Sequence, residues 1–240
     1  MAITPWDLHT AFADTALLER QFESMCLWLD KGMKRLPNGL WLPTDKQYGD
    51  WLDPKAPPAY PAHGATDPYF CANAYLVRVT GIVKSIAEIL GKSAEARRYG
   101  DDYARLRKEF HREYVTPSGR LVSDTQTAMA LALHFDLLDN EEQRKTAVER
   151  LDWLVRWDSF KVSTGFCGTP IILDTLAENG KLQLAYRMLQ NKELPSWLYP
   201  VMMGATTIVR SLIESFCIGA DGSGSDGTRC CPTARSIQVR

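Results

Sequence analysis

The chain has 240 residues, of which 45% are hydrophobic and 24% are charged, and its formal net charge is -1. These values are typical of a globular protein that is long enough to bury a sizeable core. Basic and acidic residues are interleaved, so there is no basic stripe of the kind that binds a phosphate backbone, and we expect no nucleic-acid partner.

No targeting or membrane segment is evident in the sequence. The first residues, MAITPWDLHT, lack a basic segment followed by an apolar one, and no window approaches the roughly 20 apolar residues of a membrane span. We therefore expect no membrane partner and, by default, a cytoplasmic location. The localisation of the whole protein stays open, because upstream sequence could have carried a secretion signal.

The cysteine and histidine residues do not form a metal-binding pattern. None of the four histidines is followed by another four residues later, and no C-x-x-C pair occurs among the six cysteines. Cys26, Cys71 and Cys167 stand singly among apolar neighbours and are predicted to be buried thiols. We expect no metal and no other cofactor.

Hydrophobic periodicity, interrupted at proline and glycine, predicts an all-α protein. Asp14 and Asp67 stand at expected N-caps, and Gly91 at an expected helix end. The predicted helices lie at residues 5–12, 14–35, 68–90, 93–114, 124–138, 141–158, 168–179 and 181–191, and a last helix begins near Met202.

The predicted helices alternate between two kinds. Residues 68–90, 124–138 and 168–179 are apolar over most of the helix circumference, whereas the helices that follow them carry long charged runs. A helix that is hydrophobic nearly all round must be covered on all sides, and a helix with one charged face lies outside. The pattern therefore predicts stacked αα-hairpins with inner and outer helices.

The connections between these helices alternate as well. Links from an inner to an outer helix are short and lack aromatic residues, whereas links from an outer to an inner helix are longer and rich in them. Every second connection of antiparallel helices returns to the same end, so the aromatic-rich links are expected to share one face and to carry a ligand site. Their aromatic and histidine side chains are Tyr48, Trp51, Tyr60, His63, Phe160, Phe166, Trp197 and Tyr199.

Asp50, Trp51 and Asp53 lie in the stretch YGDWLDPK of the first of these links. One interpretation is a sugar subsite, in which the indole covers the apolar C–H face of a sugar and Asp50 or Asp53 accepts hydrogen bonds from its hydroxyls. The other is a solvated turn with an Asx-type hydrogen bond. The other aromatic links on the same face favour the sugar subsite.

Three further residues are candidates for ligand contact. Gln126 lies in the first turn of a predicted inner helix, two residues after Asp124, for which a capping role is favoured. Trp197 and Tyr199 lie between two prolines that hold their segment extended. A hydrophobic plug beneath the rim is the alternative role for these two rings.

Several segments resemble the catalytic domain of α-L-rhamnosidases, glycoside hydrolase family 78: PWDLHTAFADTALLERQFESM, YGDWLDPKAPP, EYVTPSGRLVSDTQTAMALALHFDLL, STGFCGTPIILDTL and LQLAYRMLQNKELPSWLYPVMMGATTI. The resemblance covers residues 3–208 and implies an incomplete (α/α)6 toroid, a partial six-hairpin glycosidase catalytic domain. It implies cleavage of terminal α-L-rhamnose with inversion, so the partner is a rhamnose-containing small molecule or glycan. It also implies that Trp51 stacks in the rhamnose subsite beside Asp50, and that Trp197 and Tyr199 lie in a rim loop.

The two carboxylates that inversion requires are not matched in this chain. The family's general acid is a glutamate in a motif upstream of PWDL, and its general base is a glutamate in a W-E-R-W segment directly after GATTI. Here Val209 and Arg210 follow GATTI, and a guanidinium cannot accept a proton from water at neutral pH. Glu214 lies one helical turn further on and would point elsewhere. We therefore expect a hydrolase fragment that is inactive in this form, with a non-catalytic αα-hairpin scaffold or a sugar-binding remnant as the alternative.

Residues 209–240 show no resemblance to the family and shift in composition towards Gly, Ser, Cys and Arg. Translation in another frame or through an unspliced intron would explain this tail, and we expect residues 218–240 to be disordered. A toroid cut short leaves inner helices with an uncovered side. We therefore expect self-association through these helices.

Overall fold

The computed structural model of the protein describes residues 2–57 and 59–205. Apart from two isolated β-bridges, the regular structure of these ranges is helical. The predicted disorder of residues 218–240 and the predictions for Arg210 and Glu214 fall outside the described residues. The helices are α1 Ile3–Phe12, α2 Thr15–Lys31, α3 Pro68–Ile89, α4 Ser93–Tyr114, α5 Gln126–His134, α6 Glu141–Trp157, α7 Ile172–Glu178, α8 Leu182–Leu189 and α9 Leu198–Met202.

The predicted caps of α2 and α3 are confirmed. The carboxylate of Asp14 accepts a hydrogen bond from the N–H of Leu17 (3.0 Å), and that of Asp67 accepts one from the N–H of Phe70 (2.7 Å). These bonds satisfy N–H groups that have no partner within the first turn of a helix. The predicted stop of α3 is also confirmed, because Gly91 follows with a φ of 68°, a left-handed conformation that glycine adopts without steric cost.

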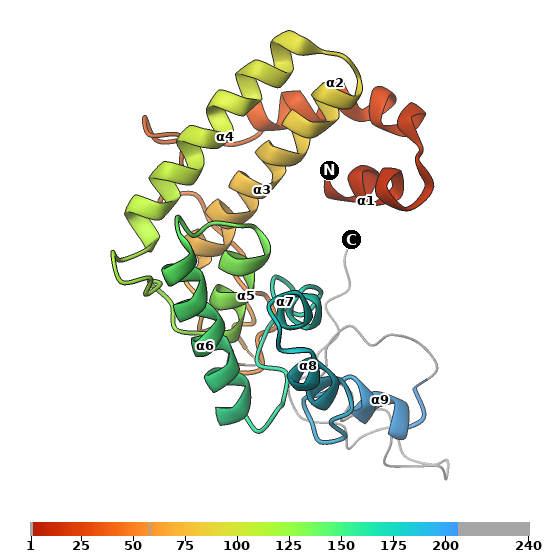
Figure 1. Ribbon diagram of the computed structural model, residues 1–240, viewed down its shortest axis with the longest axis vertical. Helices are drawn as coiled ribbons and strands as arrows, with labels where there is room; N and C mark the ends of the chain where they lie inside the picture. Colours follow the sequence, from red (N-terminus) through yellow and green to blue (C-terminus); the bar gives the residue numbers. More distant parts are fainter. Residues whose placement is uncertain (1, 58, 206–240) are drawn as a thin grey trace.

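The helices pair into hairpins that follow one another in space. α3 packs against α4, α5 against α6 and α7 against α8, while α5 also contacts both α3 and α7. In Figure 1 these hairpins follow an arc, with α1 and α2 near one end and α7 to α9 near the other. The succession of α3, α5 and α7 along one side confirms the predicted inner helices.

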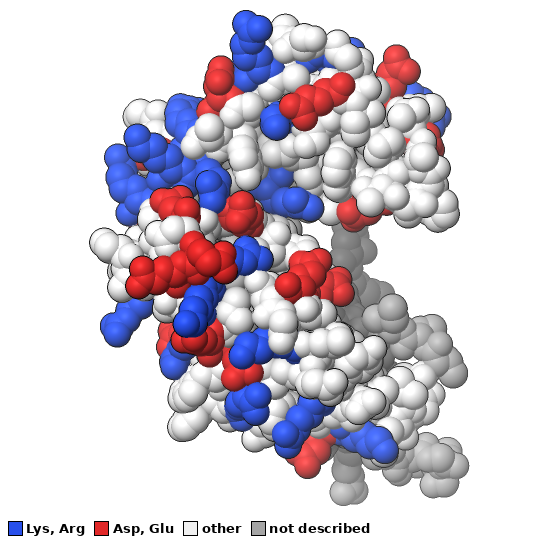
Figure 2. Space-filling view, viewed as in Figure 1, with Lys and Arg blue, Asp and Glu red and all other residues white. Residues whose placement is uncertain are grey.

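Burial and charge separate the inner from the outer helices. Every residue of α5 except the last is buried, whereas α4 buries only Tyr99, Leu106 and Phe110 of its 22 residues. Figure 2 shows acidic and basic side chains mixed over the face formed by α4 and α6. None of the helices in the described ranges is long and apolar enough to cross a membrane.

Several predicted helices have different bounds in the structure, among them α7, which begins at Ile172 and not at residue 168. α2 ends at Lys31 instead of near residue 35, since Gly32 follows directly. The last described helix begins at Leu198 and not near Met202. Pro200 lies within its first turn, where the missing N–H of proline breaks no hydrogen bond inside the helix.

The predicted capping role of Asp124 is wrong. α5 begins at Gln126, and its N-cap is Thr125, whose hydroxyl oxygen accepts a hydrogen bond from the N–H of Ala128 (3.1 Å). The helix also ends at His134, earlier than predicted. Asp124 lies outside the cap and is free to bond elsewhere.

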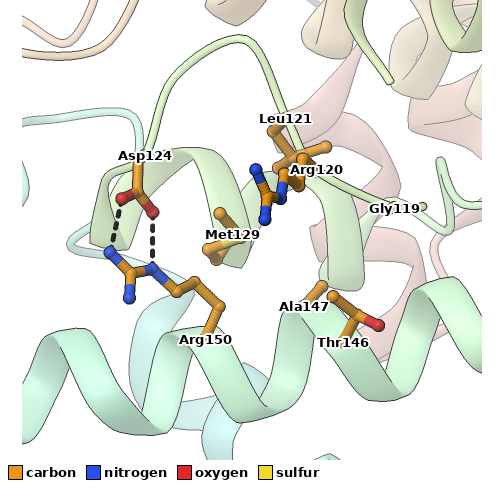
Figure 3. Close-up of a pocket in the computed structure, with 8 residues that line it drawn as sticks. All are labelled: Gly119, Arg120, Leu121, Asp124, Met129, Thr146, Ala147 and Arg150. Atoms are coloured by element: carbon orange, nitrogen blue, oxygen red, sulfur yellow. Dashed lines mark hydrogen bonds and ion pairs between the residues drawn. The ribbon is translucent and has the colours of Figure 1, made fainter. Parts of the chain in front are cut away.

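Asp124 forms an ion pair with Arg150 of α6. Its carboxylate accepts hydrogen bonds from Nε (2.8 Å) and Nη2 (2.5 Å) of that guanidinium, as Figure 3 shows. The pair lies beside a cavity of about 430 Å³ between the 119–124 segment and α6, with Met129 among its lining residues. The hydrogen bonds from Arg150 hold the pKa of Asp124 below its usual value, and the charge of Arg120 acts in the same direction.

Replacing Asp124 with asparagine tests this ion pair. Because the folded-state pKa is lowered, the pair stabilises the fold above the unfolded pKa of about 3.9, and this contribution is lost as the pH falls through the folded pKa. We expect Asp124→Asn to lower the melting temperature slightly at pH 7, because the pair is substantially exposed, and to leave it unchanged at a pH below the folded pKa. Thermal unfolding followed by circular dichroism measures both values. An equal loss at the two pH values would contradict a role for the charge.

Candidate functional site

Trp51 lies half-buried in the connection between α2 and α3. The ring of Tyr48 meets it edge-on, with centroids 5.4 Å apart and an interplanar angle of 71°, and Tyr48 itself is 64% exposed. The next residue, Leu52, has a φ of 63°, which is rare for a side chain of this size. The N–H of Leu52 donates a hydrogen bond to the carbonyl oxygen of Pro61 in the same connection (3.0 Å), which helps to hold this conformation.

Asp50 has no exposed surface, and three donors surround its carboxylate. Oδ1 accepts a hydrogen bond from the N–H of Cys167 (2.9 Å), while Oδ2 accepts one from the N–H of Gly165 (2.8 Å) and another from the hydroxyl of Thr127. Burial raises the pKa of Asp50, and these three hydrogen bonds partly offset that rise. We refer to Asp50, Thr127, Gly165 and Cys167 together as the Asp50 clasp.

The clasp brings two loops into contact along their backbones. The N–H of Phe166 donates a hydrogen bond to the carbonyl oxygen of Trp51 (2.9 Å). A Cβ added to Gly165 would lie 2.5 Å from the carbonyl oxygen of Asp50 and closer still to that of Trp51. Only glycine leaves room for so close an approach.

A second set of contacts holds the C-terminal end of the stretch YGDWLDPK. Lys55 Nζ lies 3.3 Å from Oδ1 of Asp158, whose Oδ2 accepts a hydrogen bond from Nε2 of Gln126 (2.9 Å). The Gln126 side chain, which is 1% exposed, also accepts a hydrogen bond at Oε1 from the N–H of Ser163 (3.2 Å). Asp53 is buried too, and it accepts hydrogen bonds from two backbone N–H groups of the connection between α2 and α3.

The predicted site residues fall into two groups. Asp50, Trp51 and Gln126 lie around the clasp, the first two in the connection between α2 and α3 and the third at the start of α5. Trp197 and Tyr199 lie at the start of α9, both half-buried, and Trp197 packs partly against the hydrophobic core. Their segment is tied to the loop after α6 by a hydrogen bond from the N–H of residue 162 to the carbonyl oxygen of residue 195 (3.0 Å).

Thr127, Gly165 and Cys167 were not predicted from the sequence to be residues of the site. The available signal was weak: a glycine inside an aromatic-rich link, and a threonine one residue after the helix start. Neither feature by itself predicts that these residues form hydrogen bonds with a buried carboxylate.

The site offers ring surfaces and an ordered backbone. The carboxylates of Asp50, Asp53 and Asp158 all accept hydrogen bonds from protein groups. Indole and phenol rings at the surface are suited to cover the apolar face of a ring such as a pyranose. Within residues 2–57 and 59–205, no group of three or more His, Cys, Asp or Glu residues is placed to hold a metal ion.

Gly165→Ala tests the close approach of the two loops. The added Cβ forces them apart, so we expect a loss of about 1–3 kcal/mol in the free energy of unfolding, measured by urea denaturation. Gly100→Ala is the matched control, because its Cβ would lie no closer than 3.9 Å to the nearest side-chain atom and alanine favours the helix. Equal stability of the two variants would show that the loops are not in close contact.

Comparison with known proteins places this geometry in a family. The family model of the bacterial α-L-rhamnosidase six-hairpin glycosidase domain matches residues 1–212. The α-L-rhamnosidase of Streptomyces avermitilis is 35% identical over 204 residues, which are 85% of this chain and 18% of that protein. That of an Alteromonas species is 32% identical over 209 residues, 85% of this chain and 22% of that protein. The chain thus spans about a fifth of the length of these relatives.

Solved structures share the fold. The native α-L-rhamnosidase of Aspergillus terreus has a TM-score of 0.85 at 39% identity, over 87% of this chain and 24% of that one. The S. avermitilis α-L-rhamnosidase complexed with L-rhamnose has a TM-score of 0.76 at 34% identity, over 87% of this chain and 19% of that one. The arc of inner and outer helices is therefore part of the six-hairpin toroid, and the chain belongs to the bacterial α-L-rhamnosidase six-hairpin glycosidase family.

Proposed function

We propose that this chain is a fragment of a glycoside hydrolase that cleaves terminal α-L-rhamnose from rhamnosides by an inverting mechanism. In this proposal the 240-residue chain binds the sugar but does not hydrolyse rhamnosides by itself. The observation that carries the proposal is the fold shared between 87% of this chain and a relative whose structure holds L-rhamnose.

The aromatic residues of the links from outer to inner helices, which we call the loop face, would bind the sugar directly. The half-buried indole of Trp51, with Tyr48 edge-on beside it, offers a flat apolar surface to the C–H face of a pyranose. Trp197 and Tyr199 would line the rim of the same site. Asp50 and Gln126 would contribute indirectly, by keeping the loops in place. Their polar side-chain atoms already form hydrogen bonds with protein groups.

The carboxylates around Trp51 are poorly suited to act as acid and base. An inverting glycosidase uses two carboxyl groups about 6.5–9.5 Å apart, one to protonate the leaving oxygen and one to deprotonate water. Asp50, Asp53 and Asp158 would have to give up hydrogen bonds to protein groups before doing either. We infer that the catalytic carboxylates come from outside the described residues and that the isolated chain is inactive.

A titration with L-rhamnose and an assay with an aryl α-L-rhamnoside test this proposal on the full 240-residue chain. We expect binding without release of the chromophore, and about tenfold weaker binding in Trp51→Ala, because the sugar loses its stacking surface. Trp153→Ala is the matched control, since it removes a surface indole from α6, 42% exposed in the structure, and should bind like the wild type. Sedimentation velocity on the same sample reports the self-association that we expect through the inner helices.

The outcomes separate the alternatives. Binding that Trp51→Ala weakens and Trp153→Ala does not would support the sugar site. Absence of binding would favour a non-catalytic αα-hairpin scaffold. Turnover that a single carboxylate substitution abolishes would contradict the inferred inactivity.

A further inference from the structure

We propose that Asp50 is a positioning residue, which fixes the backbone of Trp51 through the Asp50 clasp and so sets the orientation of the indole that the sugar meets. The consequence for sugar affinity rests on the proposed function. The orientation of Trp51 itself can be measured without any sugar.

The burial of Asp50 argues for this indirect role. The residue has 0% exposed surface, and both carboxylate oxygens accept hydrogen bonds from protein donors. A sugar hydroxyl could reach the carboxylate only after the clasp had opened. Trp51, the next residue along the chain, is partly exposed and can be reached directly.

The geometry of the loop explains how the clasp acts on the indole. The peptide group after Trp51 accepts the hydrogen bond from Phe166, whose neighbours Gly165 and Cys167 donate to the Asp50 carboxylate. Leu52 then takes its left-handed conformation, which its own side chain disfavours. The backbone around Trp51 is thus fixed by donors from a loop more than 100 residues away in the sequence.

Thr127 is the donor that a substitution can remove without changing the backbone. Its buried hydroxyl donates to Oδ2 of Asp50, and valine has nearly the same shape without the hydroxyl. Loss of this bond leaves a buried carboxylate with one donor fewer, which is unfavourable in a site that water does not reach. Either the carboxyl takes up a proton, which weakens the hydrogen bonds that it accepts from Gly165 and Cys167, or the clasp opens, and in both cases the loop of Trp51 is held less firmly.

Thr80 provides a matched control. Its hydroxyl is also fully buried, but it donates to the carbonyl oxygen of Leu76 (2.8 Å) within α3 and joins no loops. Thr80→Val therefore removes a buried hydroxyl without touching the clasp. Thr127→Ser restores the hydroxyl and provides the rescue.

Fluorine NMR of the full chain labelled with 5-fluorotryptophan reads out the orientation of Trp51. The Trp51→Phe variant identifies its resonance among those of the seven tryptophans. We expect one narrow Trp51 resonance in the wild type, Thr127→Ser and Thr80→Val, and several or broadened resonances in Thr127→Val. The number and width of the lines are compared, because a chemical shift also responds to a nearby methyl group.

Asp50→Asn provides a second variant if Thr127→Val does not fold. Its amide NH2 must face the N–H of Gly165 or Cys167, so we expect the same multiple or broadened resonances. A single narrow Trp51 resonance in the variant that folds, with a melting temperature lowered as in Thr80→Val, would overturn the positioning role and leave Asp50 with a purely structural one.

Titration with L-rhamnose connects orientation to affinity. If only a fraction of the molecules holds Trp51 as in the wild type, the apparent Kd rises by the inverse of that fraction, so a population of one tenth gives about a tenfold rise. Multiple resonances with an unchanged Kd would overturn the effect on affinity. Failure of the wild type to bind L-rhamnose would overturn the proposed function, while the fluorine spectra would still decide whether Asp50 positions Trp51.

Discussion

The loop face of this protein depends on one buried charge. A carboxylate removed from water is stable in a fold only when donors surround it, and the donors of Asp50 come from the first turn of α5 and from the loop before α7. Those segments must therefore lie where the structure places them, and the connection between α2 and α3 is fixed against both. The helical hairpins supply the scaffold, while this carboxylate aligns the connections that the hairpins carry.

The first turn of α5 is where these connections meet. Thr125 caps the helix and shares a hydrogen bond with Thr66 (2.7 Å), in the connection before α3. Gln126 holds the loop after α6 through Asp158, and Thr127 completes the Asp50 clasp. Three consecutive polar side chains at the start of a buried helix thus connect with segments from both sides. The burial of Gln126 and Thr127 would be unfavourable without these partners.

The sequence predicted the scaffold well because its signals are local. Periods of apolar residues, acidic N-caps and the glycine after α3 depend on neighbours within a few positions, and they predicted the inner and outer helices and the loops between them. The error at the start of α5 arose because two neighbouring residues, Asp124 and Thr125, could each have capped the helix. Thr125 caps the helix, and Asp124 instead accepts hydrogen bonds from Arg150 of α6, which lies 26 residues further along the chain.

The hydrogen bonds around Asp50 were harder to predict, because the residues that form them are far apart in the sequence. An aspartate in a Gly- and Pro-rich loop is expected to be exposed, since acidic side chains are rarely buried. The donors that bury Asp50 lie 77, 115 and 117 residues further along the chain, and no periodic pattern links them to it. Trp51 was recognisable from its motif, whereas the residues that hold it became visible only in three dimensions.

Amide hydrogen exchange of Gly165 and Cys167 tests the central claim most directly. Both N–H groups lie in a loop, yet each donates to the buried Asp50 carboxylate, so the clasp must open before either can exchange. We expect both amides to exchange as slowly as the hydrogen-bonded amides of α5. Exchange of either amide at the rate of an unstructured peptide would contradict the claim that the Asp50 clasp holds the loop face together.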